Sequence, residues 1–413
     1  SDQTATLRGN LSSDRDKQLD YYRTIWPGFA DLRKKRASLT EEQKKITAQE
    51  KITMIASDNA KMRPTYMLNR GEYDNRGEEV KPGALGSIFP YSKNLPANRL
   101  GLAKWLTDPK NPLTARVVVN RYWQMIFGIG LVKTSEDFGT QGDRPSHPEL
   151  LDTLTVDFVE SGWDVKRLLR NIVTSQTYRQ SSRRSPGLAK RDPENRFLAR
   201  GSRRRLEAEF LRDHALSTSG LLVRKIGGPG VNPYQPAVLF GRNAIGSSGA
   251  KFTQGRGDDL YRRSLYTYWK RQIPAANIRI LGADGRTTCR TRREVTNTPL
   301  QAFVMLNDPQ FVEAARMLGQ RAMKKGGSSA RDRISHAFRL ATSRHINERE
   351  LKILLAEFED RLYEFKTNAE VAKQYLNGGG EKPIDPSLAP AEAASYAAIA
   401  SLILNLDESL SSN

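Results

Sequence analysis

The residues between 289 and 301 form the polar cluster with the clearest chemical potential. They lead into the start of an expected helix and combine a thiol, two guanidinium groups and three neutral polar side chains: Cys289, Arg292, Arg293, Thr296, Asn297 and Gln301. Backbone N–H groups at a helix start, with guanidinium groups beside them, bind carboxylate, sulfate or phosphate. We therefore predict a substrate- or anion-binding site made by four of these residues: Arg292, Arg293, Asn297 and Gln301. The structural alternative is that Thr296 or Asn297 only caps the helix while the arginines pair with acidic neighbours.

A second polar row occupies one face of another expected helix. Arg116, Asn120 and Gln124 are spaced four residues apart, so their side chains point to the same side. They could line a pocket that positions a substrate or binds an anion. A solvated flank, or a buried network that holds helices together, would have the same spacing.

Metal and nucleophilic chemistry have weak support. His147, Glu149 and Asp152 are close together, but the four histidines of the chain lack the spacing of a metal motif such as H-E-x-x-H, so we predict no metal site. Cys289 beside Arg290 could act as a nucleophile, and an inert, partly buried thiol is the alternative that we favour. The sequence has no G-x-S-x-G elbow. The catalytic residues stay unassigned.

The single cysteine excludes several cofactors. A chain with one cysteine has no internal disulfide, no Cys-x-x-Cys pair, no iron–sulfur cluster ligated by its own cysteines and no Cys-x-x-Cys-His haem attachment. We therefore expect no cofactor in this chain.

The charge balance indicates an anionic partner. The chain has 66 lysines and arginines against 46 acidic residues, a formal net charge of +20 over 413 residues. Nucleic acid, an anionic envelope surface, a sulfated polysaccharide or an acidic protein domain would all attract such a chain. Because no helix-turn-helix, RNA-binding or zinc-finger motif is present, we predict no nucleic-acid partner. No apolar run is long enough for a transmembrane segment.

Periodicity predicts a mainly α fold, a compact multi-helix bundle with long ordered loops and a few short β-strands. Capping patterns predict helix starts at Thr40 with Gln43, at Asn111 with Pro112, and at Ser146 with Glu149. Alternation of side chains predicts a strand over 262–271. These patterns divide the chain into six predicted segments: 1–60, an N-terminal arm and surface helix; 61–97, a strand and Gly/Pro-rich loop; 98–222, a first helical unit; 223–257, a long loop; 258–376, a strand plus second helical unit; and 377–413, a linker and closing helix.

Five ordered blocks carry a family resemblance: RLGLAKWLTDPKNPLTARVVVNRYWQMIFGIGLVKTSEDFGTQGDRPSHPELLDTL, GWDVKRLLRNIVTSQTYRQSS, YRRSLYTYWKR, TNTPLQAFVMLNDPQFVEAAR and LILNLDESL. Together they resemble the planctomycete-specific C-terminal domain, a family of unknown function that follows cytochrome c-like domains in large exported proteins. The resemblance extends from about Thr53 to Leu410. It implies a periplasmic or secreted protein, with haem c on a separate domain or partner. Since the chain opens with Ser1 and shows no export signal of its own, we expect a processed product or a fragment.

Three functions are compatible with these observations. In the first, this helical module has no haem of its own, docks on a haem-bearing cytochrome domain or subunit as an electron-transfer partner, and helps form a pocket for an unknown, conceivably oxidative reaction. In the second, the chain is a non-catalytic protein that binds a polyanion such as a sulfated glycan. In the third, it is a structural assembly subunit.

Overall fold

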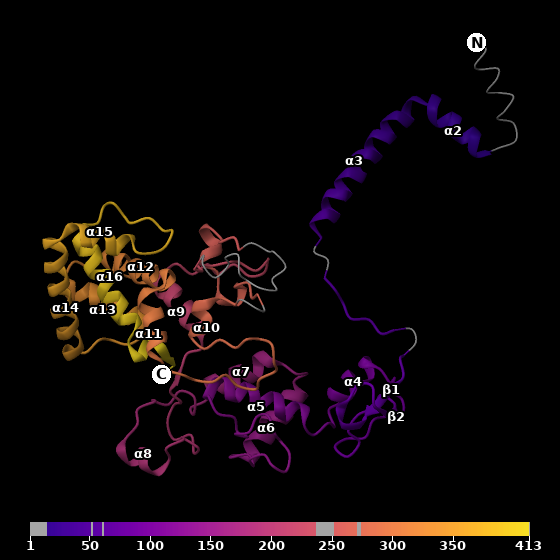
Figure 1. The fold of residues 1–413 in the computed structure, drawn as a ribbon, viewed down its shortest axis with the longest axis horizontal. Helices are drawn as coiled ribbons and strands as arrows, with labels where there is room; N and C mark the ends of the chain where they lie inside the picture. Colours follow the sequence, from indigo (N-terminus) through magenta and orange to yellow (C-terminus); the bar gives the residue numbers. More distant parts are fainter. Residues whose placement is uncertain (1–14, 51–52, 60–61, 237–251, 271–273, 413) are drawn as a thin grey trace. The chain divides into compact units, whose positions relative to one another are not determined.

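The computed structural model describes residues 15–412 except 51–52, 60–61, 237–251 and 271–273. Helices dominate this part of the chain, and its strands are few and short, which confirms the predicted mainly α fold. The chain divides into two compact units (Figure 1). One lies within residues 1–84 and 91–103, and the other comprises residues 85–90 and 104–413.

The first unit contains a helical arm and a β-hairpin. Helix α2 (Arg15–Ile25) is followed by α3 (Pro27–Gln49), which has proline at its first position and no buried residue. The predicted helix start at Thr40 is wrong: Thr40 lies inside α3, where its hydroxyl donates to the Arg36 carbonyl at 2.8 Å. Strands β1 (Thr65–Leu68) and β2 (Arg76–Val80) pair antiparallel, with Thr65 opposite Val80. Helix α4 (Arg99–Leu106) leads into the second unit.

The smaller core of the second unit lies between three helices, α5 (Thr114–Phe127), α6 (Pro148–Glu160) and α7 (Val165–Thr174). Apolar residues at helical spacing fill it, among them Val119, Trp123, Phe158, Leu168 and Ile172. A short helix, α8 (Pro186–Arg191), lies in the connector that follows.

Two predicted helix starts in this core need correction. The Asn111 side chain accepts N–H bonds from Leu113 at 3.0 Å and Thr114 at 3.2 Å, so it closes a turn, and α5 begins two residues after Pro112. Helix α6 has His147 at its N-cap without a side-chain capping bond. The Ser146 hydroxyl lies instead 3.0 Å from His147 Nδ1, so the capping box with Glu149 does not form.

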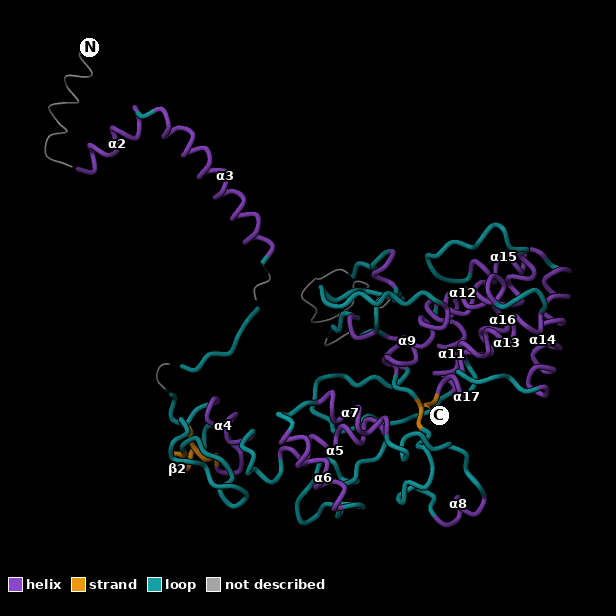
Figure 2. Tube along the Cα trace, turned by 180° about the vertical axis from the view of Figure 1, so that it is seen from behind, coloured by secondary structure: helices purple, strands orange, loops and turns teal. Residues whose placement is uncertain are grey.

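The larger core gathers helices from residue 208 onward, seen together in Figure 2: α9 (Ala208–Ser219), α10 (Ala276–Ile280), α11 (Pro299–Asn307), α12 (Pro309–Lys325), α13 (Ala330–Thr342), α14 (Glu348–Thr367), α15 (Ala369–Asn377), α16 (Pro390–Leu404) and α17 (Asp407–Leu410). Helices α12 and α16 cross so closely that a Cβ on Gly319 would lie 2.8 Å from the Ala397 nitrogen. Although residues 98–222 were expected to form one helical unit, α9 packs against α12 in this larger core.

The strand predicted over 262–271 does not form in the described residues 262–270, and Arg271 lies outside the described residues. Residues Gly257–Leu260 and Ser264–Tyr266 form 3-10 turns, and only isolated bridges join Arg262 to Val223 and Thr267 to Val231. The guanidinium of Arg212 donates to the carbonyls of Leu260 and Arg262, at 2.6 and 2.8 Å. Because these carbonyls bond to a buried side chain, the segment wraps around Arg212 instead of joining a sheet.

A two-residue ladder ties the middle of the chain to its C-terminal segment. Strand β3 (Arg204–Arg205) pairs antiparallel with β4 (Ser411–Ser412), and the Leu206 N–H donates to the Leu410 carbonyl at 2.8 Å. This pairing holds Arg204 and Arg205 in an extended conformation, and Arg203 directly precedes them.

Candidate anion-binding cleft

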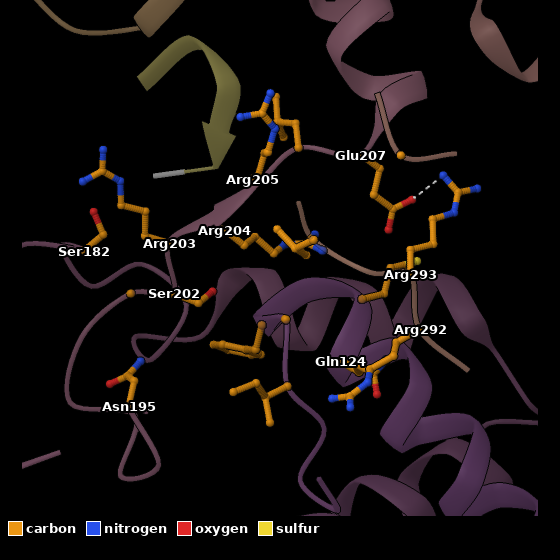
Figure 3. A pocket seen from close by; sticks show the side chains of 18 of the residues that line it. Gln124, Ser182, Asn195, Ser202, Arg203, Arg204, Arg205, Glu207, Arg292 and Arg293 are labelled. Atoms are coloured by element: carbon orange, nitrogen blue, oxygen red, sulfur yellow. Dashed lines mark ion pairs between the residues drawn. The ribbon is translucent and has the colours of Figure 1, made fainter. Parts of the chain in front are cut away.

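An open cavity of about 1850 Å³ lies within the second unit. Its walls come from the C-terminal half of α5 and from residues within segments 181–184, 193–208 and 281–296. Arg344, His345, Asn347 and Glu408 complete the lining. Figure 3 shows Arg203, Arg204 and Arg205 on one stretch of backbone, with Arg292 and Arg293 on another stretch near α5. We call this cavity the arginine cleft.

Arginine dominates the walls of the cleft. Of the described residues that line it, twelve are arginines, five are acidic and none is lysine. The local charge is therefore positive, and it is carried entirely by planar groups that can each hold two oxygen atoms of one anion.

Five of these arginines have carboxylate partners. Arg293 donates to both carboxylate oxygens of Glu209, at 2.5 and 3.1 Å. It also forms an ion pair with Glu207 at 3.2 Å, and Figure 3 draws this second pair. The hydrogen bonds with Glu209 raise the pKa of the Arg293 guanidinium. Arg344 pairs with Glu350 and Glu408, both at 2.6 Å. The other three are Arg203 with Asp407, Arg286 with Glu209, and Arg290 with Asp284 and Glu294.

The other seven arginines have no carboxylate within 4.0 Å in the part of the chain that the structure describes: Arg121, Arg183, Arg184, Arg200, Arg204, Arg205 and Arg292. Arg204 packs at the carbonyl end of α5, where a Cβ on Gly128 would lie 3.4 Å from its Cδ. A helix C-terminus favours a cation, and the left-handed Gly128, with φ of 85°, ends the helix there. These seven guanidinium groups give the cleft its uncompensated positive charge.

Internal hydrogen bonds hold the connector loop of 192–201 in place. The Asp192 carboxylate accepts N–H bonds from Arg196 at 2.8 Å and Phe197 at 2.9 Å. Burial acts to raise the pKa of Asp192, but these bonds and the charge of Arg200 outweigh it and lower that pKa. Arg200 is 8% exposed and donates from Nη2 to the carbonyls of Asp192 and Pro193, at 2.9 and 3.1 Å. These bonds fix the backbone path of the loop.

Several buried polar atoms of the cleft residues lack a hydrogen-bond partner among the described residues. They are Arg200 Nη1, Arg204 Nε, Arg205 Nε and Asn195 Oδ1. A buried N–H without an acceptor costs about 1–3 kcal/mol, and more when the group is charged. Three of these atoms are guanidinium donors.

The structure brings three of the predicted site residues to the cleft. Arg292 is exposed on its wall, and Arg293 lies beside it in the ion pairs described above. Gln124 is buried, donates to the Thr291 carbonyl at 3.2 Å and accepts from the Ser135 hydroxyl. It thereby joins α5 to segment 281–296, and Figure 3 shows its side chain close to Arg292.

Arg116 and Asn120 lie outside the cleft lining. Arg116 pairs with Asp152 of α6 at 2.8 Å. Asn120 is fully buried and exchanges hydrogen bonds with the backbone of Val132, at 2.8 and 3.0 Å. Both side chains hold helix α5 to its neighbours.

Asn297 and Gln301 also lie outside the lining. Asn297 accepts a 3.0 Å bond from Arg205 Nη1 and so steadies a cleft arginine. Gln301 donates to the Ile280 carbonyl at 3.0 Å and to the Thr296 hydroxyl at 2.9 Å. The predicted caps are corrected by one or two residues: Thr298, and neither Thr296 nor Asn297, caps α11 in a capping box with Gln301.

The sequence analysis did not identify the triplet Arg203 to Arg205 or the connector arginines as site residues. The signal was present as a run of basic residues, RRR at 203–205 and RR at 183–184. A basic run is also typical of a solvated surface, so composition alone could not place it in a cavity.

The described residues contain no group of three or more His, Cys, Asp and Glu side chains that could hold a metal ion. Cys289 is exposed. In the same part of the chain, no helix has the length and apolar character to cross a membrane.

Comparison with known proteins identifies a family. No curated protein and no solved structure matches the chain. A family model described as PSD1, protein of unknown function (DUF1553), matches residues 98–358. The match covers more than half of the chain and includes most of the cleft. The chain therefore belongs to the DUF1553 (PSD1) family of proteins of unknown function.

Proposed function

We propose that this protein binds an anionic glycan, carrying sulfate or carboxylate groups, in the arginine cleft. One observation carries the proposal: seven arginines without a carboxylate partner among the described residues line a single cavity. Like charges at this density repel one another, so a fold that gathers them is stabilised when an anion binds.

The size and chemistry of the cleft favour an extended ligand. Small-molecule pockets enclose about 300–1,000 Å³, and this cavity measures about 1850 Å³. Guanidinium forks match the paired oxygens of sulfate and carboxylate groups. The hydroxyls of Ser182 and Ser202, which also line the cleft, can bond to sugar hydroxyls.

The aromatic side chains of the cleft argue for a glycan over single-stranded nucleic acid. Proteins that bind single strands stack bases on exposed aromatic rings. Phe127 lines the cleft but is 6% exposed and stacks on Trp123, with 4.2 Å between the ring centroids. The surface therefore offers charge and hydrogen-bond donors in place of a stacking platform.

A second candidate function is docking on a haem-bearing cytochrome domain or subunit in the periplasm. It is supported by the resemblance described above and by an exposed apolar row on α11. Leu300, Phe303 and Leu306 are 54%, 62% and 46% exposed, and a protein partner would cover them. In that assembly the arginine cleft would position an anionic substrate.

The test compares two triple variants with equal loss of charge. R183Q/R204Q/R292Q removes three unpaired arginines of the cleft, whereas R349Q/K352Q/K366Q removes three exposed cations of α14, outside the cleft. The probe is a fluorescein-labelled heparin oligosaccharide, titrated by fluorescence anisotropy between 50 and 300 mM salt, with an oligogalacturonate as the sulfate-free comparison.

We expect the cleft variant to bind the oligosaccharide at least about tenfold more weakly. Because each lost contact removes roughly one released counterion, the slope of log K against log salt should fall by about three. The α14 variant should change affinity by less than about twofold. Equal losses in both variants would refute the cleft as the site. Absence of glycan binding, together with co-purification of a haem protein, would favour the second candidate.

A further inference from the structure

Helix α3 presents an apolar stripe that nothing in the described chain covers. Leu32, Leu39 and Ile46 recur every seven residues and are 52%, 56% and 59% exposed. Most of the stability of a helix in a protein comes from packing its apolar face. A strict seven-residue repeat is the signature of a coiled-coil seam.

The intervening positions complete a heptad pattern. When Leu32, Leu39 and Ile46 occupy d, the a positions are Phe29, Arg36 and Gln43. Polar residues at a positions limit which helix can pair with α3 and in which orientation, because the side chain that each one faces must be compatible with its charge or polarity. In a parallel pair of identical helices, Arg36 would face Arg36 of the second copy, which is repulsive. In an antiparallel pair, a faces d, so the aliphatic stem of Arg36 would cover Leu39 of the second copy.

The flanking charges select the same orientation. Four basic residues, 33–36, come before two acidic ones, Glu41 and Glu42. Side chains at g face g of the other helix in an antiparallel coiled coil, and here the g positions are Lys35 and Glu42. Lys35 of each copy would meet Glu42 of the other. A parallel pair would place Lys35 opposite Thr40 and align the two basic segments.

We propose that α3 joins two copies of this protein through an antiparallel two-stranded coiled coil. The occupant of the exposed stripe is the same helix of a second copy, because the charge pattern of α3 is complementary to its own reverse. The dimer carries two arginine clefts, which would let a long polyanion bind at two points, but dimerisation itself does not depend on the cleft.

The seam is tested with the full chain by sedimentation equilibrium between 1 and 200 μM. L39K places a charge in the seam and should yield a monomer. S38K adds the same charge at the outward-facing position next to it and should remain dimeric, with unchanged far-UV circular dichroism in both. A monomeric wild-type protein at 200 μM, or an L39K variant that dimerises like S38K, overturns the proposal.

The orientation is tested with charge reversal. K35E and E42K should each weaken dimerisation, roughly tenfold, because two attractive pairs become repulsive. A mixture of the two should form a heterodimer in which both pairs are attractive, with an affinity near that of the wild type. In a C289S background, I46C should form no intermolecular disulfide, because Ile46 would face Phe29 of the second copy and lie far from the other Ile46. Failure of the mixture to recover, or rapid I46C cross-linking, indicates another orientation and overturns the antiparallel arrangement.

Discussion

Replacing Arg292 and Arg293 by glutamine, one at a time, separates ligand binding from structural support in the cleft. The two residues are adjacent in sequence and line the same cavity, so each substitution removes one positive charge at nearly the same place. They differ in their partners. Arg292 is exposed with no carboxylate within 4.0 Å among the described residues, whereas Arg293 is held by Glu209 and Glu207.

The expected magnitudes follow from those partners. A charged hydrogen bond contributes about 1.5–3 kcal/mol when buried, but Arg293, Glu209 and Glu207 are 28%, 18% and 39% exposed, so water weakens the interaction. For a bidentate pair at this exposure we expect R293Q to lower the free energy of unfolding by about 1–2 kcal/mol. Arg292 has no hydrogen bond or ion pair with the other described residues, so R292Q should change the free energy of unfolding by less than about 0.5 kcal/mol.

Binding should show the opposite order. R292Q should reduce the salt slope for the heparin oligosaccharide by about one, because the guanidinium of Arg292 is free to contact an anion. R293Q should leave the slope nearly unchanged, since its donors already serve two carboxylates. Urea unfolding gives the stabilities, anisotropy titrations give the slopes, and R349Q is the control for one lost charge. Equal changes of slope for R292Q and R293Q would refute the reasoning that ion pairing decides which arginines bind.

Two further predictions concern the scaffold. G319A should destabilise the protein by roughly 2 kcal/mol, because the new Cβ would lie 2.8 Å from the backbone of α16; a thermal melt that matches the wild type would contradict this close crossing. Asp192 has a lowered pKa, so its contribution to stability is complete above its unfolded value of about 4 and is lost as the pH falls through the lower folded value. D192N should remove the part of the stability loss at low pH that comes from protonation of Asp192. The melting temperatures of the wild type and the variant, compared from pH 2 to 6, should therefore converge as the pH falls. A difference that stays constant over this range would show that Asp192 does not cause the loss.

The helix caps illustrate where sequence reasoning was limited. Asp164 and Asn347 cap helices α7 and α14 with their side chains. Asn111, by contrast, closes a turn, although its side chain accepts the same kind of backbone bond. A capping side chain needs only two or three neighbouring N–H groups, and turns and helices both supply them. Only the path of the following residues distinguishes the two.

The segment 262–271 shows the same limit for strands. Its alternating side chains are compatible with a sheet, but a strand also needs a neighbour for its backbone. The nearest available partner is the buried Arg212, whose guanidinium takes the carbonyls of Leu260 and Arg262. The alternation does not translate into two faces: a strand would put Leu265 and Thr267 on the same side, but Leu265 is exposed and Thr267 is buried, next to the 3-10 turn Ser264–Tyr266.

The amino-acid sequence alone determined the helical class, the family and the excess of positive charge, because helical periodicity, ordered motifs and composition are local or additive properties. The cleft was decided by the tertiary structure. Its arginines come from positions 121 to 344, and the pairing of β3 with β4 and the bond from Gln124 to Thr291 bring distant segments together. Whether a given arginine is neutralised depends on which carboxylate the fold places within about 4 Å of it. That is why Arg292 and Arg293, indistinguishable in the sequence, have different surroundings in the folded protein.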